Sequence, residues 1–214
     1  MSTLKKILIS IGILLVLVGL VIGGLFIFTK KEAPEETTPD SNTVNAPLTV
    51  DKTKDLGACT LLDKGSLKKT LGTVATDLQG PDNVGLVKTG AGSTYLLQTC
   101  VYAFKTGGTI DNSFNISNGF SIEVAELADQ TQANTLRKGY KDDGAMTVTA
   151  LGDQAFYQVI VIDNPQAQLN TFSLTVFKGA KYYAYSITQP KDATTFTAQT
   201  AQQALETIAK SVSY

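Results

Sequence analysis

A long uncharged run near the start of the chain most constrains how this sequence can fold. No charged residue interrupts the stretch from Ile7 to Phe28, and lysines flank it at positions 5, 6, 30 and 31. As a helix, this run would rise about 33 Å at ~1.5 Å per residue, enough to cross the hydrocarbon core of a bilayer. We therefore expect a single transmembrane helix over residues 7–28.

The run has the features of a permanent anchor. It exceeds the 7–15-residue apolar core of a cleavable signal peptide, and no A-x-A pattern follows it. The tetrapeptide ending at Cys59 looks like a lipobox, but it lies far beyond the run and behind several charged residues. We expect an uncleaved signal anchor, with residues 1–6 as a cytoplasmic tail. Lysines at both ends leave orientation open under the positive-inside rule; the short tail and the cysteine pair favour an extracytoplasmic C-terminal part.

Composition divides the remainder into a stalk and a domain. Residues 29–55 are rich in proline, threonine and acidic residues and contain no aromatic residue. Such a segment buries too little apolar surface to fold and is expected to act as a flexible tether. Residues 56–214 have the length of one ordinary domain with a core of its own.

The sequence contains no histidine, which excludes several kinds of chemistry at once. Ser-His-Asp triads, Cys-His pairs and His-ligated metal sites all require that residue. The net charge of −1 offers no basic field for nucleic acid. We expect no enzymatic activity, cofactor, bound metal or nucleic-acid partner.

The chain has two cysteines, Cys59 and Cys100. An even number of cysteines in a domain on the oxidising side of a membrane predicts one disulfide. Two buried free thiols in a cytoplasmic domain are the alternative.

Residue patterns predict three helices in residues 56–214. The first carries Leu67 and Leu71 on one face, with Asp63 or Ser66 as its cap and Gly72 after its end. The second follows Asp129 and turns Ala133, Leu136 and Tyr140 inward, and the third runs from Thr194 to Val212 with a clear apolar stripe.

Strands are expected between and after these helices. Residues 95–104, 120–124, 146–150 and 155–162 have strand patterns, and the nearly all-apolar 155–162 reads as a central strand. Gly179-Ala180 suits a two-residue hairpin loop. Residues 73–94 are interpreted as an exposed loop with a short strand near 84–87, and residues 105–118 as a polar hairpin connection. The fold class is thus α+β: an antiparallel sheet with helices packed on one face, in the order α-β-β-α-β-β-β-α, preceded by the transmembrane helix.

Several short motifs together resemble a known family. Cys59 precedes a Leu-Leu-Asp helix start, Val101-Tyr102 follows Cys100, and residues 151–156 read Leu-Gly-Asp-Gln-Ala-Phe before a strand. The pattern resembles actinobacterial-type envelope lipoproteins of unknown function and, more loosely, the extracytoplasmic sensor domain of a mycobacterial Ser/Thr kinase. The resemblance implies a sheet with flanking helices, a disulfide between the Cys59 and Cys100 positions, and a cleft for a ligand or partner.

Tyrosines gather in the strand-rich half of the domain. Tyr157, Tyr183 and Tyr185 are the candidate ligand-binding residues, because tyrosine offers rigid apolar area and a hydroxyl group. The alternative is that these residues pack across strands in the core.

The function expected from these features is that of a single-pass cell-membrane protein whose extracytoplasmic domain recognises a partner protein or an envelope ligand without chemistry. The alternatives are a structural subunit of a membrane complex and a hydrolase using a Ser-Lys dyad or carboxylates.

Overall fold

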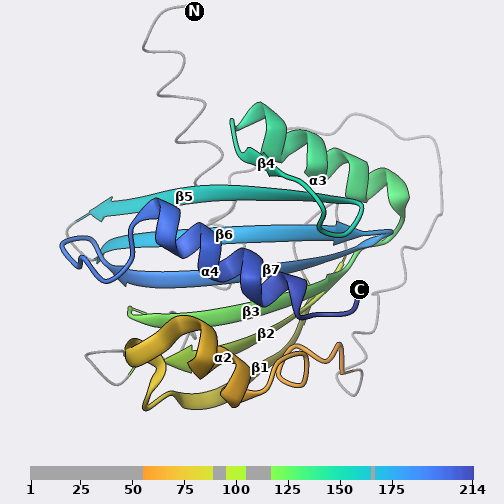
Figure 1. Cartoon of the computed structure of the whole chain (residues 1–214). Helices are drawn as coiled ribbons and strands as arrows, with labels where there is room; N and C mark the ends of the chain where they lie inside the picture. The colour runs from red at the N-terminus through yellow and green to blue at the C-terminus, as the bar shows by residue number, and fades with distance from the viewer. Residues whose placement is uncertain (1–54, 89–94, 105–116, 165–166) are drawn as a thin grey trace, which may run out of the picture. The chain divides into compact units, whose positions relative to one another are not determined.

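A computed structural model of the chain describes residues 55–88, 95–104, 117–164 and 167–214 (Figure 1). The expected transmembrane helix, most of the stalk and most of the connection at 105–118 lie outside these ranges. Within them, no helix is long and apolar enough to cross a membrane.

The domain is built on one antiparallel sheet of seven strands in the order β1-β2-β3-β7-β6-β5-β4. The first three strands form a meander, and α3 then carries the chain to the far edge, from which four strands return until β7 pairs with β3. The strands are β1 Gln79–Lys88, β2 Leu96–Ala103, β3 Gly119–Glu126, β4 Met146–Val148, β5 Gln154–Asn164, β6 Ala167–Lys178 and β7 Lys181–Pro190. The α+β class and the antiparallel sheet are confirmed.

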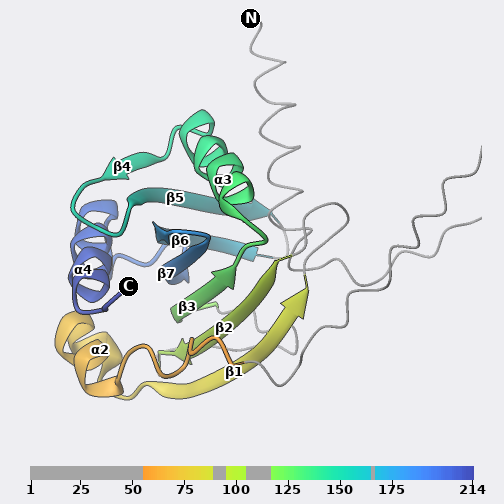
Figure 2. The same ribbon diagram turned by 90° about the vertical axis from the view of Figure 1, so that its right-hand side faces the viewer.

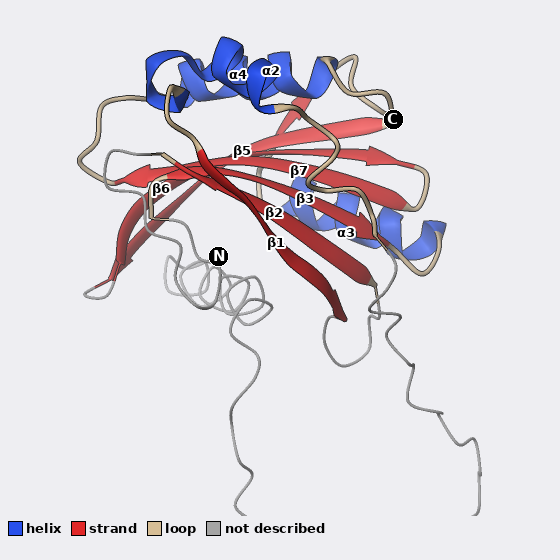
Figure 3. Cartoon of the chain, turned by 90° about the horizontal axis from the view of Figure 1, so that it is seen from below, coloured by secondary structure: helices blue, strands red, loops and turns tan. Residues whose placement is uncertain are grey.

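Helices cover both faces of the sheet, so the expectation that all of them pack on one face is wrong. The helices α2 (Lys64–Leu71) and α4 (Ala198–Lys210) lie on one face, whereas α3 (Gln130–Asp142) lies on the other (Figures 2 and 3). A 3-10 turn, Gly72–Ala75, follows α2. The inward-facing side predicted for α3 is confirmed. The crossover to the far edge of the sheet decides which face of the sheet this side of α3 meets.

Strand β1 corrects the interpretation of residues 73–94 as a loop. Gln79–Lys88 pairs antiparallel with β2 along its length, with two register shifts. Its Gly-Pro-Asp-Asn composition is poor for a strand. Pairing with β2 outweighs that local preference, and the irregular register fits a strand at the edge of the sheet.

Caps fix the starts of α2 and α3 where the sequence indicates. The side chains of Asp63 and Asp129 accept hydrogen bonds from backbone N–H groups in the first turns of α2 and α3, and Thr197 forms a reciprocal capping box with Thr200. Gly72 ends α2 with φ +72°, a conformation that favours glycine. The third helix is four residues shorter at its start than expected, because Thr197 is its cap.

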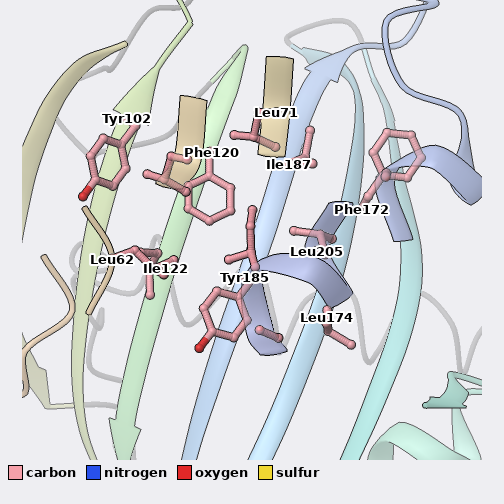
Figure 4. Close-up of a cluster of buried hydrophobic side chains, with 14 of the residues drawn as sticks. Leu62, Leu71, Tyr102, Phe120, Ile122, Phe172, Leu174, Tyr185, Ile187 and Leu205 are labelled. Atoms are coloured by element: carbon pink, nitrogen blue, oxygen red, sulfur yellow. The ribbon is translucent and has the colours of Figure 1, made fainter. Parts of the chain in front are cut away.

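The main core lies between the sheet and the α2–α4 layer. Figure 4 shows side chains from both sources interdigitating: Leu71 and Leu205 from the helices meet large residues of the strands. The fully buried strand residues include Tyr102, Phe120, Ile122, Leu174, Tyr185 and Ile187. Aromatic residues dominate a smaller cluster under α3, where Tyr140 stacks on Phe156 at 5.3 Å between ring centroids.

The segment before α2 is fastened to β2 in two ways. Cys59 and Cys100 form a disulfide, with Cα atoms 5.0 Å apart. The buried side-chain oxygen of Gln98 accepts hydrogen bonds from the backbone N–H groups of Leu56 and Ala58, at 2.9 and 3.1 Å. The predicted disulfide is confirmed, and together with Gln98 it fastens the segment that leads into α2 to β2.

Strand β5 is not the central strand that its apolar sequence suggests. It pairs with β6 throughout, but β4 pairs with it only along Ala155–Tyr157. The rest of β5 lies at the edge of the described sheet, where Val159 and Val161 are exposed.

Candidate functional site: the groove between α2 and α4

Helix α2 is short; its apolar side is buried, and one polar side remains outside the core. Leu67 and Leu71 face the core, and Asp63 accepts hydrogen bonds from both the backbone N–H and the hydroxyl of Ser66. Lys69 and Thr70 follow at helical spacing from Ser66, so these polar side chains line the flank of α2 that turns toward α4.

Helix α4 is positioned by a buried polar residue at the end of β7. The amide of Gln189 donates to the carbonyl oxygens of Ala193 and Phe196 and accepts from the backbone N–H of Phe196. Gln189 is 2% exposed, so its three hydrogen bonds hold the connection into α4 in one arrangement. The apolar stripe of α4, comprising Ala201, Leu205, Ile208 and Ala209, then packs on the sheet.

A surface groove of about 570 Å³ lies between the two helices. Seven of its nine lining residues have polar side chains: five hydroxyls, one amide and one ammonium group, beside two apolar residues. The lining residues are Ser66, Lys69, Thr70, Thr200, Gln203, Ala204, Thr207, Ile208 and Ser211.

Several of the hydroxyl groups that line the groove already donate hydrogen bonds within the protein. The hydroxyl of Ser66 donates to Asp63, that of Thr207 to the carbonyl of Gln203, and that of Ser211 to the carbonyl of Ile208. A hydroxyl has one proton to donate but two lone pairs, so these oxygens keep the capacity to accept hydrogen bonds from a ligand. They suit a ligand that supplies hydroxyl or amide donors.

Positive charge adjoins this row of acceptors. Lys64, Lys68 and Lys69 are exposed on α2, and no acid among the described residues lies within ion-pair distance of them. Lys210 contacts Glu206 at 3.4 Å within α4, and neither residue lines the groove. The groove therefore combines hydroxyl oxygens with a helix that carries three lysines and one capping carboxylate, Asp63.

The three tyrosines named from the sequence lie beneath α4 and do not line this groove. Tyr157 and Tyr185 are buried, and their hydroxyls contact the carbonyl of Ala198 and the hydroxyl of Tyr214, at 2.6 and 3.1 Å. Tyr183 packs edge-on against Tyr214 at 4.9 Å. Burial raises the pKa of Tyr157 to about 12. These tyrosines support α4 and the C-terminus, and their role in ligand binding stays a prediction.

Sequence reasoning missed the groove because its walls are about 130 residues apart in the chain. One signal was present: Thr200, Gln203, Thr207 and Ser211 recur at spacings of three and four, which marks a polar stripe along α4. Ser66 and Thr70, four residues apart on α2, are the matching pair.

A second polar cluster lies on the α3 face of the sheet. The hydroxyl of Tyr182 donates to the carboxyl group of Glu123 at 2.6 Å, and Tyr95 packs against the Tyr182 ring. Burial raises the pKa of Glu123, and the hydrogen bond from Tyr182 opposes that rise. Glu126, by contrast, contacts Lys181 at 3.8 Å, and its odd spacing from Glu123 along β3 directs the two side chains to opposite faces of the sheet.

Replacing Glu123 with glutamine is expected to stabilise the domain at neutral pH. Because the folded pKa of Glu123 exceeds its unfolded value, its contribution to stability is greatest below the unfolded pKa and is lost as pH rises through the folded pKa. Glutamine keeps an acceptor for Tyr182 without the buried charge. At pH 7 the Glu123→Gln variant should therefore melt at a higher temperature than the natural chain. At pH 4 the two should melt at the same temperature. A constant difference at both pH values would contradict the titration account.

Comparison with models of known protein families gave no match for this chain. Searches among curated proteins and among solved structures likewise found no similar protein. The resemblance to envelope lipoproteins therefore stays a prediction from the short motifs.

Proposed function

We propose that this chain is a membrane-anchored, extracytoplasmic binding protein of a cell envelope. The apolar run at residues 7–28 supports the anchor. The disulfide between Cys59 and Cys100 supports an oxidising location, because such bonds persist outside the cytoplasm. Binding without chemistry agrees with a sequence that has no histidine.

The groove between α2 and α4 is the proposed binding site, and its composition defines the ligand. Hydroxyl oxygens of Ser66, Thr207 and Ser211 accept hydrogen bonds from ligand hydroxyls, while Lys69 attracts negative charge. A hydroxylated, anionic polymer of the envelope meets both demands. The observation that carries the proposal is the meeting of this acceptor row with a helix whose lysines form no ion pair with any acid of the described residues.

Titration of the purified full-length chain in detergent with three fluorescent polymers tests this function. Poly(glycerol phosphate) carries hydroxyls and charge, dextran carries hydroxyls alone, and poly(glutamate) carries charge alone. The groove should bind the first more tightly than either of the others, and the affinity should fall with added salt because exposed charges are screened.

Reversing one charge in the groove is expected to weaken binding of poly(glycerol phosphate). Lys69→Glu replaces an attraction with a repulsion and should raise Kd at least about tenfold, equivalent to about 1.4 kcal/mol. Lys141→Glu is the matched control, because Lys141 is also exposed but lies on α3, across the sheet. Equal losses in the two variants, or equally tight binding of poly(glutamate), would reduce the interaction to general polyanion attraction and contradict the assignment.

A further inference from the structure

The outer half of β5 has an open edge within the described sheet. β6 pairs with β5 along its whole length, whereas β4 covers only Ala155–Tyr157. From Gln158 to Asp163, every second residue directs its backbone N–H and C=O away from β6. Such an edge is a template for another strand unless the chain protects it.

This edge is apolar on both of its faces. Val159 and Val161, on the α2–α4 face, are 42% and 52% exposed. Ile160 and Ile162, on the α3 face, are partly exposed. Lysine, proline and bulges are the usual protections of an edge strand, and the run Gln158–Ile162 has none of them.

The opposite edge of the sheet is protected. Pro81 in β1 has no N–H to donate, and two register shifts interrupt the ladder between β1 and β2. One edge of the domain therefore resists strand addition while the other is suited to it.

We propose that the edge of β5 pairs with the same edge of a second copy of this chain. The two strands run antiparallel about a two-fold axis at Ile160, perpendicular to the sheet. Ile160 then faces Ile160 of the second copy, and Val159 faces Val161 across the axis on the more exposed face. Residues directly opposite in such a pair share a face, so each exposed valine meets an apolar partner.

Charge and length favour a second copy over a different strand. The ionised residue at the end of the run, Asp163, already forms an ion pair with Lys191 and lies outside the five-residue pairing from Gln158 to Ile162. No like charges therefore oppose one another across the axis. Met146 beside Tyr157 limits the pairing at the other end. So short a pair buries less than the ~1,200 Å² of a standard interface, which suits a dimer that depends on local concentration.

Disulfide cross-linking of the full-length chain in membranes tests the pairing. Because Cys59 and Cys100 are bonded to each other, Ile160→Cys introduces a single free thiol. Mild oxidation should convert Ile160→Cys to a covalent dimer at least about fivefold more than Lys138→Cys, an exposed control on α3. Separately tagged Val159→Cys and Val161→Cys chains, when co-expressed, should also cross-link to each other.

A charge on the edge should abolish this cross-link without unfolding the domain. Val161→Lys, added to Ile160→Cys, places a solvated ammonium group opposite the copy's Val159, and an exposed substitution of this kind changes stability by less than about 0.5 kcal/mol. Loss of the dimer with an unchanged melting temperature supports the proposal. Dimer formation no greater than in the Lys138→Cys control, persistence of the dimer in Val161→Lys, or cross-linking of Ile160→Cys to a different protein would each overturn it.

Discussion

Removing the disulfide by replacing Cys59 and Cys100 with alanine is expected to lower the free energy of unfolding by about 4 kcal/mol. The two cysteines are 41 residues apart in sequence, and the cross-link removes the entropy of that loop from the unfolded chain. The location of the bond also matters for function, because it fastens the segment that leads into α2, and α2 forms one wall of the groove. Urea unfolding of the natural chain and of the double variant measures the difference.

Two comparisons separate the cross-link from the loss of packing at the two sites. The natural chain treated with reductant should unfold at about the same urea concentration as the double variant. Gln98 keeps its hydrogen bonds to Leu56 and Ala58 in both, so residual order of that segment is the same. A double variant within 1 kcal/mol of the oxidised natural chain would contradict the proposed role of the bond.

Gly152→Ala is expected to destabilise the domain by at least about 3 kcal/mol. Gly152 has φ +53°, where a side chain is strained by roughly 1 kcal/mol. A Cβ atom there would also lie 2.4 Å from the carbonyl oxygen of Phe177 and 2.7 Å from Val176. The same carbonyl accepts the N–H of Asp153 at 2.8 Å, so the backbone cannot yield without breaking that bond.

Gly179→Ala is the matched control for this prediction. Gly179 has a similar φ of +57° in the β6–β7 hairpin, but an added Cβ would meet no atom within 4 Å. Its substitution should cost roughly 1 kcal/mol, from backbone strain alone. Thermal or urea unfolding of both variants gives the comparison. Equal destabilisation of the two variants would show that the close approach of the added Cβ to Phe177 costs no free energy.

Local features of the fold could be predicted from the sequence because the residues that determine them are neighbours in the chain. The caps Asp63 and Asp129 and the turn at Gly179-Ala180 are of this kind: each depends on a hydrogen bond or a backbone angle within a few residues. The disulfide required one further argument, the location of the domain. The caps, the turn and the disulfide are confirmed, whereas the location stays a prediction.

Features that depend on topology could not be predicted in this way. The composition of Gln79–Lys88 argues against a strand, yet pairing with β2 makes it one. The apolar run of β5 has the pattern of a central strand, and only the crossover through α3 places it beside the edge. The groove joins α2 to α4 across most of the domain sequence. In each case a partner distant in sequence outweighs or supplements the local signal.

Membrane topology is the claim on which the proposed function most directly depends. A single exposed thiol at Lys138→Cys can be labelled with a charged maleimide that does not cross the cytoplasmic membrane, before and after the cells are lysed. The proposed topology predicts full labelling of the thiol while the cytoplasmic membrane is intact. Labelling that appears only after lysis would place the domain in the cytoplasm and contradict the account.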